Sequence, residues 1–248
     1  MDEFINKYGK ETNKYYKNNK IVGVNSIKDD TDNNAYLLLK EYESNPNFRL
    51  DEPVSIDSAH YNPGKRNVGI DKGVSDNHRK EITEKYNENY ELYFKTPSSG
   101  KGEGKQEEKK MVHCLKHVGT IGEVKIVDYE IPLCDRGTGE GKGNIDLVFY
   151  YGNDFYIIET KKLNSDESLL RCVLEIETYY ESLNSNFSNN INYSNKINKG
   201  LLLDKNSTAY KHYFDGNHNN VKKLMKKYKI DLFELELINN KFNIKKVI

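Results

Sequence analysis

Three charged residues lie within two very apolar segments of this chain. Asp146 and Glu159 are carboxylates, and Lys161 follows Glu159 by two positions, while most of their neighbours are aliphatic or aromatic. Carboxylates are the usual protein ligands of a hard divalent cation such as Mg²⁺, and an ammonium group can hold a phosphate or the water that attacks it. These residue types predict chemistry on a phosphate ester, provided that the fold brings them together.

The two apolar segments predict a β-hairpin that would bring them together. Gly152-Asn153 is a typical two-residue hairpin turn. In the register that this turn sets, Asp146 lies opposite Glu159, and Lys161 shares the face of Glu159 because side chains alternate along a strand. We expect a metal site made by both carboxylates and the backbone carbonyl of Thr160. The alternative is that the charges only mark strand ends that contact solvent.

The segments around the hairpin predict an α/β fold. Apolar side chains on both faces of its strands are typical of a sheet that is covered on both sides. We expect a mixed central sheet of four or more strands flanked by helices. The expected helices span 107–117, 166–183 and 221–228, and the expected strands span 124–133, 199–203, 233–238 and 242–247, with Asn164 and Glu167 as a capping box before the second helix.

The chain divides into three parts by composition. Residues 1–96 predict an irregular N-terminal extension of unknown role, with a strand at 20–27, helices at 34–43 and 77–94, and a loop at 45–76. Residues 97–105 are rich in Ser, Gly and Lys and predict a linker. Residues 106–248 hold the hairpin and predict the functional domain.

Composition and charge narrow the class of protein. The chain is 31% charged and 36% hydrophobic with zero net charge, which argues against nucleic-acid binding driven by global charge but permits local basic clusters at 161–162 and 222–229. It has no apolar run of transmembrane length, and its acidic start is unlike a signal peptide. Three scattered cysteines without a CxxC pattern fit a reducing compartment. We expect a cytoplasmic protein without membrane association.

The pattern Asp146-(x)12-Glu159-x-Lys161, on a hairpin between a preceding helix and strand and a following helix, resembles the PD-(D/E)xK, or restriction-endonuclease-like, nuclease superfamily. The resemblance covers about residues 106–205, and Ile145 stands where the family motif has proline. It implies a metal-dependent nuclease that hydrolyses DNA, or in second place RNA. In this family the matching carboxylates bind Mg²⁺ or Mn²⁺ and the lysine assists hydrolysis of the phosphodiester.

The resemblance also implies functional residues on the flanking helices. Many members carry an acidic residue on the helix before the core, a place that Glu107 or Glu108 could fill. The alternative is an ordinary acidic charge near a helix N-terminus.

The helix after the hairpin carries a polar stripe of residues spaced by four. Arg171 would contact a phosphate and Tyr179 would stack on or orient another group, while Glu175 stands where some members have glutamine. Lys162 adds a positive charge beside the site. The alternative for Arg171 and Glu175 is an ordinary ion pair on the helix surface.

Other interpretations of the sequence stay open. The chain could be a noncatalytic nucleic-acid-binding or assembly module on a nuclease-like scaffold, it could act as a homodimer, and its N-terminal third could sense a ligand. His113, Cys114 and His117 have a spacing that can bind zinc. The Gly-rich segment 135–143 predicts a flexible loop, in which Arg136 or Lys142 would touch a backbone phosphate.

Overall fold

The computed structural model describes residues 16–17, 20–21, 31–44, 103–132, 144–183, 196–239 and 241–248. The expected helix at 77–94, the expected loops at 45–76 and 135–143, and most of the N-terminal extension and the linker lie outside the described residues. Within the extension, β1 (Tyr16–Lys17) and β2 (Lys20–Ile21) form a small antiparallel pair.

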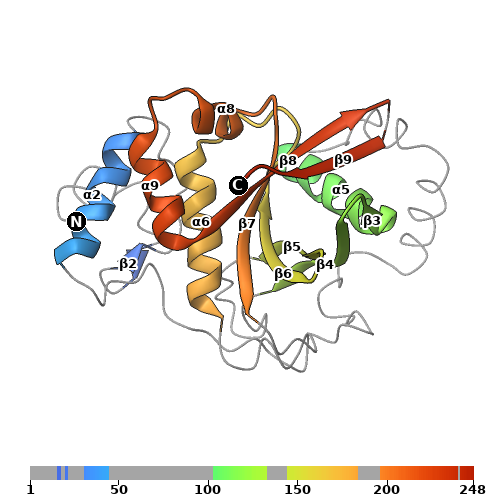
Figure 1. Cartoon of the computed structure of the whole chain (residues 1–248), viewed down its shortest axis with the longest axis horizontal. Coiled ribbons are helices and arrows are strands. Elements are labelled where there is room, and N and C mark those ends of the chain that lie inside the picture. Colours follow the sequence, from blue (N-terminus) through green and yellow to red (C-terminus); the bar gives the residue numbers. More distant parts are fainter. Residues whose placement is uncertain are drawn as a thin grey trace.

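A seven-stranded mixed sheet forms the centre of the molecule (Figure 1). Its strands lie side by side in chain order, and all neighbours are antiparallel except the β6–β7 and β7–β8 pairs, which are parallel. The strands are β3 (Thr120–Ile121), β4 (Val124–Pro132), β5 (Asn144–Tyr151), β6 (Asp154–Thr160), β7 (Ile197–Asp204), β8 (Ile230–Ile238) and β9 (Lys241–Lys246). The two edge strands β3 and β9 contact each other, so the sheet curls toward a barrel.

The parallel strands explain where three of the helices lie. α6 (Leu169–Ser182) connects β6 to β7, and α8 (Thr208–Phe214) and α9 (Asn219–Tyr228) connect β7 to β8. Crossovers between parallel neighbours are almost always right-handed, so two crossovers that step in the same direction place their helices on the same face. α6 accordingly packs against both α8 and α9.

Two apolar cores fill the two sides of the sheet. On the side of α6, Leu169 and Val173 pack against Ile157 and Leu201. On the other side, buried residues of α5 (Glu103–Val118), including Met111 and Leu115, pack against Phe149, Tyr156 and Ile158. The expectation of a mixed sheet flanked by helices is confirmed.

Most expected elements are confirmed, and three details were wrong. α5 begins at Glu103, so residues 103–105 belong to a helix and not to the linker. α6 begins at Leu169, and Ser168 caps it by accepting a hydrogen bond from the Arg171 N–H at 3.3 Å. Asn164 does not form a capping box; it adopts a positive φ of 55°. The third error was the omission of α8, which is too short to produce a clear periodic pattern.

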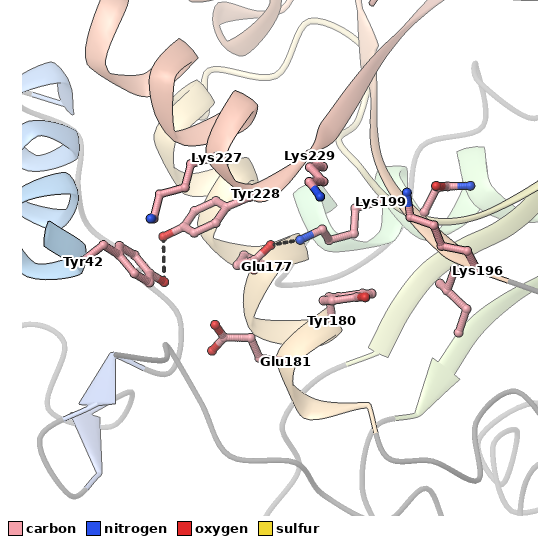
Figure 2. A pocket seen from close by; sticks show the side chains of 11 residues that line it. Tyr42, Glu177, Tyr180, Glu181, Lys196, Lys199, Lys227, Tyr228 and Lys229 are labelled. Carbon is pink, nitrogen blue, oxygen red and sulfur yellow. Dashed lines mark hydrogen bonds and ion pairs between the residues drawn. The ribbon is translucent and has the colours of Figure 1, made fainter. Parts of the chain in front are cut away.

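The N-terminal helix α2 (Thr31–Ser44) docks on α9. The carboxylate of Asp32 accepts hydrogen bonds from the backbone N–H of Asn220 at 2.7 Å and of Val221 at 3.2 Å. At the other end of the contact the hydroxyls of Tyr42 and Tyr228 are 3.0 Å apart (Figure 2). Because His218, the residue at the α9 N-cap position, makes no capping hydrogen bond with its side chain, Asp32 caps this helix from a distant part of the chain.

This contact makes a specific prediction about α2. The Asp32→Ala variant should lose about 1–2 kcal/mol of stability, the usual cost of removing a helix cap, and hydrogen exchange should rise first in α2 and α9. Urea unfolding and exchange mass spectrometry measure the two effects. Glu43→Ala is the matched control, because Glu43 is exposed on α2 and pairs only with Lys40 of the same helix among the described residues. An equal loss in both variants would contradict the capping role.

None of the described helices combines the length and the apolar character that crossing a membrane requires.

Candidate active site

The hairpin has the predicted register up to its last backbone pair. Tyr151 pairs with Asp154 next to the turn, and Leu147 pairs with Ile158 at the far end. Gly152 has a φ of 57°, while Asn153 does not have a positive φ, as in a type II′ turn. The next pair in this register would join Asp146 to Glu159, but the backbone ladder ends one pair earlier.

Beyond the last backbone pair, the side chain of Asp146 in β5 hydrogen-bonds the backbone at the end of β6. Its Oδ2 accepts a hydrogen bond from the Thr160 N–H at 2.9 Å. The Thr160 hydroxyl donates to the Leu202 carbonyl of β7 at 2.7 Å, and Thr160 is fully buried. Asp146 and the end of β6 are therefore fixed relative to each other, as a metal site made by Asp146, Glu159 and the Thr160 carbonyl would require.

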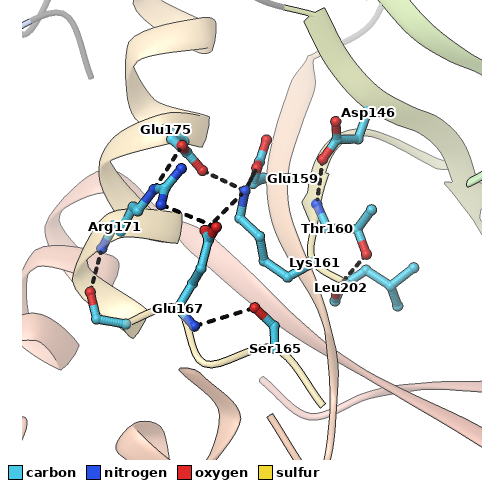
Figure 3. A network of polar contacts seen from close by, with 10 residues as sticks. Asp146, Glu159, Thr160, Lys161, Ser165, Glu167, Arg171, Glu175 and Leu202 are labelled. Carbon is cyan, nitrogen blue, oxygen red and sulfur yellow. Dashed lines mark hydrogen bonds and ion pairs between the residues drawn. The ribbon is translucent and has the colours of Figure 1, made fainter. Parts of the chain in front are cut away.

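Lys161 lies inside a cage of carboxylates (Figure 3). Its ammonium, just beyond the end of β6, pairs with Glu159 of β6, with Glu175 of α6 at 2.6 Å and with Glu167 at 3.4 Å. Glu159 is 2% exposed and Lys161 is 4% exposed, so these two side chains are almost closed to solvent, while Glu167 and Arg171 are partly exposed. Glu159 and Lys161 are thus in direct contact, two further carboxylates complete the cage, and Asp146 lies close enough for its charge to raise the pKa of Glu159.

Arg171 closes the outer side of the cage. Its guanidinium pairs with Glu167 at 3.1 Å and with Glu175 at 3.2 Å. The Arg171–Glu175 pair is the ordinary helix pair that the spacing allowed, but Glu175 also binds Lys161 and so belongs to the site. Arg171 is partly buried against these carboxylates at the outer side of the cage.

Of the two acidic candidates on the preceding helix, Glu108 lies close to Asp146 and Glu107 lies at the surface. Glu107 is exposed and pairs with Lys162 at 3.0 Å, so both residues lie at the surface rim. Glu108 is partly buried, and its charge raises the pKa of Asp146. Burial raises the pKa of Glu108 itself, while Lys161 counters this effect. α5 therefore contributes a third acidic group close to the two predicted metal ligands.

The loop between β6 and α6 is held by the end of β7. The backbone N–H of Asn164 donates to the carboxylate of Asp204 at 2.7 Å, and the Thr208 N–H donates to the Ser165 carbonyl at 2.8 Å. The Ser165 hydroxyl in turn accepts from the Glu167 N–H at 3.3 Å. These bonds fix the short loop from which Glu167 reaches Lys161.

Burial and neighbouring negative charges disfavour ionisation of the two predicted metal ligands. Burial raises the pKa of Asp146 well above its usual value, and the charge of Glu108 adds to the effect. Burial likewise raises the pKa of Glu159, and the charge of Asp146 adds to it. Carboxyl groups with such shifts ionise readily only when a cation compensates their charge.

Lys161 and Glu175 are held in their charged forms. Burial alone would lower the pKa of Lys161, but Glu159, Glu175 and Glu108 outweigh it and raise this pKa well above the usual value. Burial would raise the pKa of Glu175, but Lys161 and Arg171 outweigh it and lower this pKa.

Tyr179 lies on the last part of the same polar stripe. Burial raises the pKa of its hydroxyl well above the usual value, and the charges of Glu159, Glu175 and Asp146 add to the rise. Its side chain is partly buried. All four residues assigned to the flanks of the site, Arg171, Glu175, Tyr179 and Lys162, therefore border it, with Lys162 at the exposed rim.

The donor set fits a divalent cation. Asp146, Glu159, Glu108, Glu167 and Glu175 contribute five carboxyl groups, and Lys161 and Arg171 contribute two cations, so the site carries three excess negative charges when all of its carboxyl groups are ionised. One buried oxygen of Glu159, Oε2, meets no hydrogen-bond donor among the described residues. An unpartnered carboxylate oxygen in a site with excess negative charge is what an oxygen-ligated cation such as Mg²⁺ or Mn²⁺ would satisfy.

The sequence analysis did not predict one member of the site, and several other candidate residues lie outside the described part of the chain. Glu167 was taken as a capping residue, although its spacing of four from Arg171 signals an ion pair across one helical turn. Arg136 and Lys142 lie outside the described residues, as do the side chains of His113 and His117. Cys114 between those histidines is buried in α5.

Comparison with known proteins finds no match to this chain among protein families, curated proteins or solved structures.

Proposed function

We propose that this chain is a metal-dependent nuclease with a restriction-endonuclease-like core. The observation that supports the proposal best is the meeting of Asp146, Glu159 and Lys161 at one end of the hairpin, with an unpartnered buried oxygen on Glu159. An apolar hairpin gains no stability from two buried carboxylates whose charged forms are disfavoured, so a ligand that compensates them is the simplest physical reason for their presence.

Each residue has a distinct role in this proposal. Asp146 and Glu159, with the Thr160 carbonyl and Glu108, would hold Mg²⁺ or Mn²⁺, which supplies Lewis-acid stabilisation of the phosphate and a water of lowered pKa. Lys161 would exchange its longest contact, that with Glu167 at 3.4 Å, for the attacking water, and its charge would balance negative charge that develops on the phosphate.

The flanking residues would receive the substrate. Arg171 lies beside the carboxylate cage and could exchange its contact with Glu167 for a substrate phosphate, since a guanidinium binds both anions in the same forked geometry. Lys162 is exposed at the rim and adds positive charge there. Because net charge is zero, affinity for nucleic acid would come from such local groups. We propose DNA as the first substrate and RNA as the second, on the basis of the superfamily resemblance.

A cleavage assay tests the proposal. The full chain is incubated with supercoiled plasmid, single-stranded DNA and single-stranded RNA, each with Mg²⁺, with Mn²⁺ or with a chelator. We expect metal-dependent strand breaks in at least one of the DNA substrates and none with the chelator. The absence of cleavage in every substrate with both ions, from protein that binds Mn²⁺ in calorimetry, would overturn the proposal.

A second function is favoured by a cavity beyond the other end of α6. Its volume is about 400 Å³, and its lining combines four lysines and three tyrosines with two glutamates, Glu177 and Glu181 (Figure 2). The basic residues are Lys196, Lys199, Lys227 and Lys229, and the aromatic residues are Tyr42, Tyr180 and Tyr228. Lysines pair with phosphates and tyrosine rings stack on bases, so this surface would suit a noncatalytic nucleic-acid-binding module.

Calorimetric titration separates the two functions. A nuclease should bind Mn²⁺ through Asp146 and Glu159, and its affinity should increase as the pH rises through the raised pKa values of these groups, because protons compete with the metal. A binding module should retain nucleic acid without binding Mn²⁺ at this site. Loss of nucleic-acid binding in Lys227→Met, which removes an exposed lysine of this lining, but not in Asp146→Asn would favour the module.

A further inference from the structure

Three potential metal ligands lie together at the junction of α8 and α9, apart from the carboxylate cage. His212 belongs to the last turn of α8, Asp215 is the residue at which α8 ends, and His218 is the residue that precedes α9. One potential ligand atom from each residue lies within 4.8 Å of those of the other two. The regular spacing of three residues places them on one side of the turn.

The two imidazoles face each other closely. Their ring centroids are 3.8 Å apart, and the ring planes differ by 12°. A metal ion lies in the plane of an imidazole ring that ligates it, so one of the two rings would turn out of the stack by a side-chain rotation when both bind the same ion.

Hydrogen bonds account for two of the three side chains but not for the third. The Nδ1 of His218 is 2.9 Å from Oδ2 of Asp215, and Oδ1 of Asp215 accepts from the Asn217 N–H at 2.8 Å. The Nδ1 of His212 is buried and has no hydrogen-bond partner among the described residues. A buried imidazole nitrogen without a partner costs free energy, and a metal ion bound to this nitrogen would remove that cost.

The turn that carries these residues is ordered by its own bonds. Asp215 N–H donates to the Lys211 carbonyl at 3.0 Å, and the Asn219 side-chain amide donates to the Gly216 carbonyl at 2.9 Å. Gly216 has a φ of 78°, which lets the chain reverse between the two helices. The three ligands are therefore presented by a formed turn, and their assembly requires no rearrangement of the backbone.

We propose that His212, Asp215 and His218 form a second metal site, distinct from the carboxylate cage, that takes Zn²⁺ or a similar first-row transition ion. Two imidazoles and one carboxylate suit such a borderline-soft ion, whereas Mg²⁺ prefers oxygen ligands alone. Three protein ligands leave a fourth position for water or another group. The ion would join the end of α8 to the start of α9, and so fix the crossover from β7 to β8.

Zinc titration of the metal-free full chain tests this site. The titration is run by calorimetry in excess Mg²⁺, so that the carboxylate cage does not take up zinc, and is repeated with Co²⁺, whose visible absorption reports nitrogen ligation and geometry. The wild type should bind one Zn²⁺ at this site, and His212→Ala and His218→Ala should each lower the affinity at least about tenfold, since even groups that only support a ligand cost that much. Asp146→Asn should leave the zinc affinity unchanged.

The controls use the other histidine pair and a measure of folding. The double variant His113→Ala/His117→Ala should keep the zinc affinity of the wild type. Zinc should raise the midpoint of thermal unfolding of the wild type and of this double variant, but not that of His218→Ala. If His212→Ala fails to fold, His218→Gln provides the comparison. Equal affinity in wild type and His218→Gln, or loss of binding in the His113/His117 variant, would overturn the proposal.

Discussion

Asp146→Asn should lower the proposed metal-dependent cleavage by at least about 10²–10³-fold, the usual cost of removing one group that stabilises charge in a transition state. Asparagine keeps the size of the side chain, and its carbonyl oxygen can still accept the hydrogen bond from Thr160 N–H. It lacks the charge that would hold the cation. Initial rates on the preferred substrate, measured at several Mn²⁺ concentrations, give the effect.

The same substitution should stabilise the metal-free protein. The pKa of Asp146 is raised by burial and by the charge of Glu108, so its ionised form is disfavoured in the fold at neutral pH. Removing that charge should raise the free energy of unfolding, measured in urea with a chelator present. A variant that is more stable and yet inactive would separate a functional carboxylate from a structural one.

Glu107→Gln is the matched control for Asp146→Asn. Glu107 is an exposed carboxylate at the rim of the same site and pairs with Lys162. It should retain the cleavage rate of the wild type within a factor of a few. Full activity in Asp146→Asn, or equal losses in both variants, would contradict the role of Asp146 as a metal ligand.

Lys161→Met should destabilise the metal-free protein by about 3–5 kcal/mol, the usual cost of removing one partner from a buried ion pair. Methionine has nearly the same length, so the main change is the loss of a buried cation from contact with Glu159, Glu175 and Glu167. Arg171 would remain the only cation in contact with this group of described carboxylates. Urea unfolding at pH 8 measures the loss.

The loss in Lys161→Met should depend on pH with a defined sign. The pKa of Glu159 is already raised by burial and by Asp146, and Lys161 opposes that rise. A carboxyl group whose pKa is higher in the folded state stabilises the protein fully below its unfolded pKa, and this stability is lost as the pH rises through the folded value. The deficit relative to the wild type should therefore shrink when the pH is lowered from 8 toward the pKa range of free glutamate.

Lys162→Met provides the control for this prediction. Lys162 is the next residue in the chain, but its side chain is 36% exposed and it pairs with an exposed partner, Glu107. Exposed pairs contribute about 0–1 kcal/mol, so this variant should lose little stability. A large loss in Lys162→Met, or a small one in Lys161→Met, would show that the cage is not closed around Lys161.

Local sequence was sufficient to predict the hairpin and its register. The turn at Gly152-Asn153 and the alternation of side chains are properties of a few adjacent residues, and they determine which positions pair. The meeting of Asp146, Glu159 and Lys161 follows from that register. The helical stripe from Arg171 to Tyr179 was also readable, because residues spaced by four share a helix face.

Local sequence was not sufficient where a residue had two possible roles. Asn164 and Ser168 can each cap a helix, and the bond from Asn164 N–H to Asp204, a residue 40 positions away, decided in favour of Ser168. The position of Glu167 is compatible with a capping box and with an ion pair. Its contact with Lys161 in the folded structure shows that it forms an ion pair. α8 was missed because a helix of two turns carries too little periodicity.

What the sequence determined by itself is the set of groups that can do chemistry and their order along one hairpin, because strand pairing and side-chain alternation act over short separations. What only the tertiary structure decided is how these groups are charged and enclosed. The effect of Glu108 on the pKa of Asp146 and the cap that Asp32 provides for α9 join segments distant in sequence, and the carboxylates meet Lys161 only because α6 packs beside the end of β6. Burial and Coulomb interactions depend on distances in space, and packing of the whole sheet and its helices sets those distances.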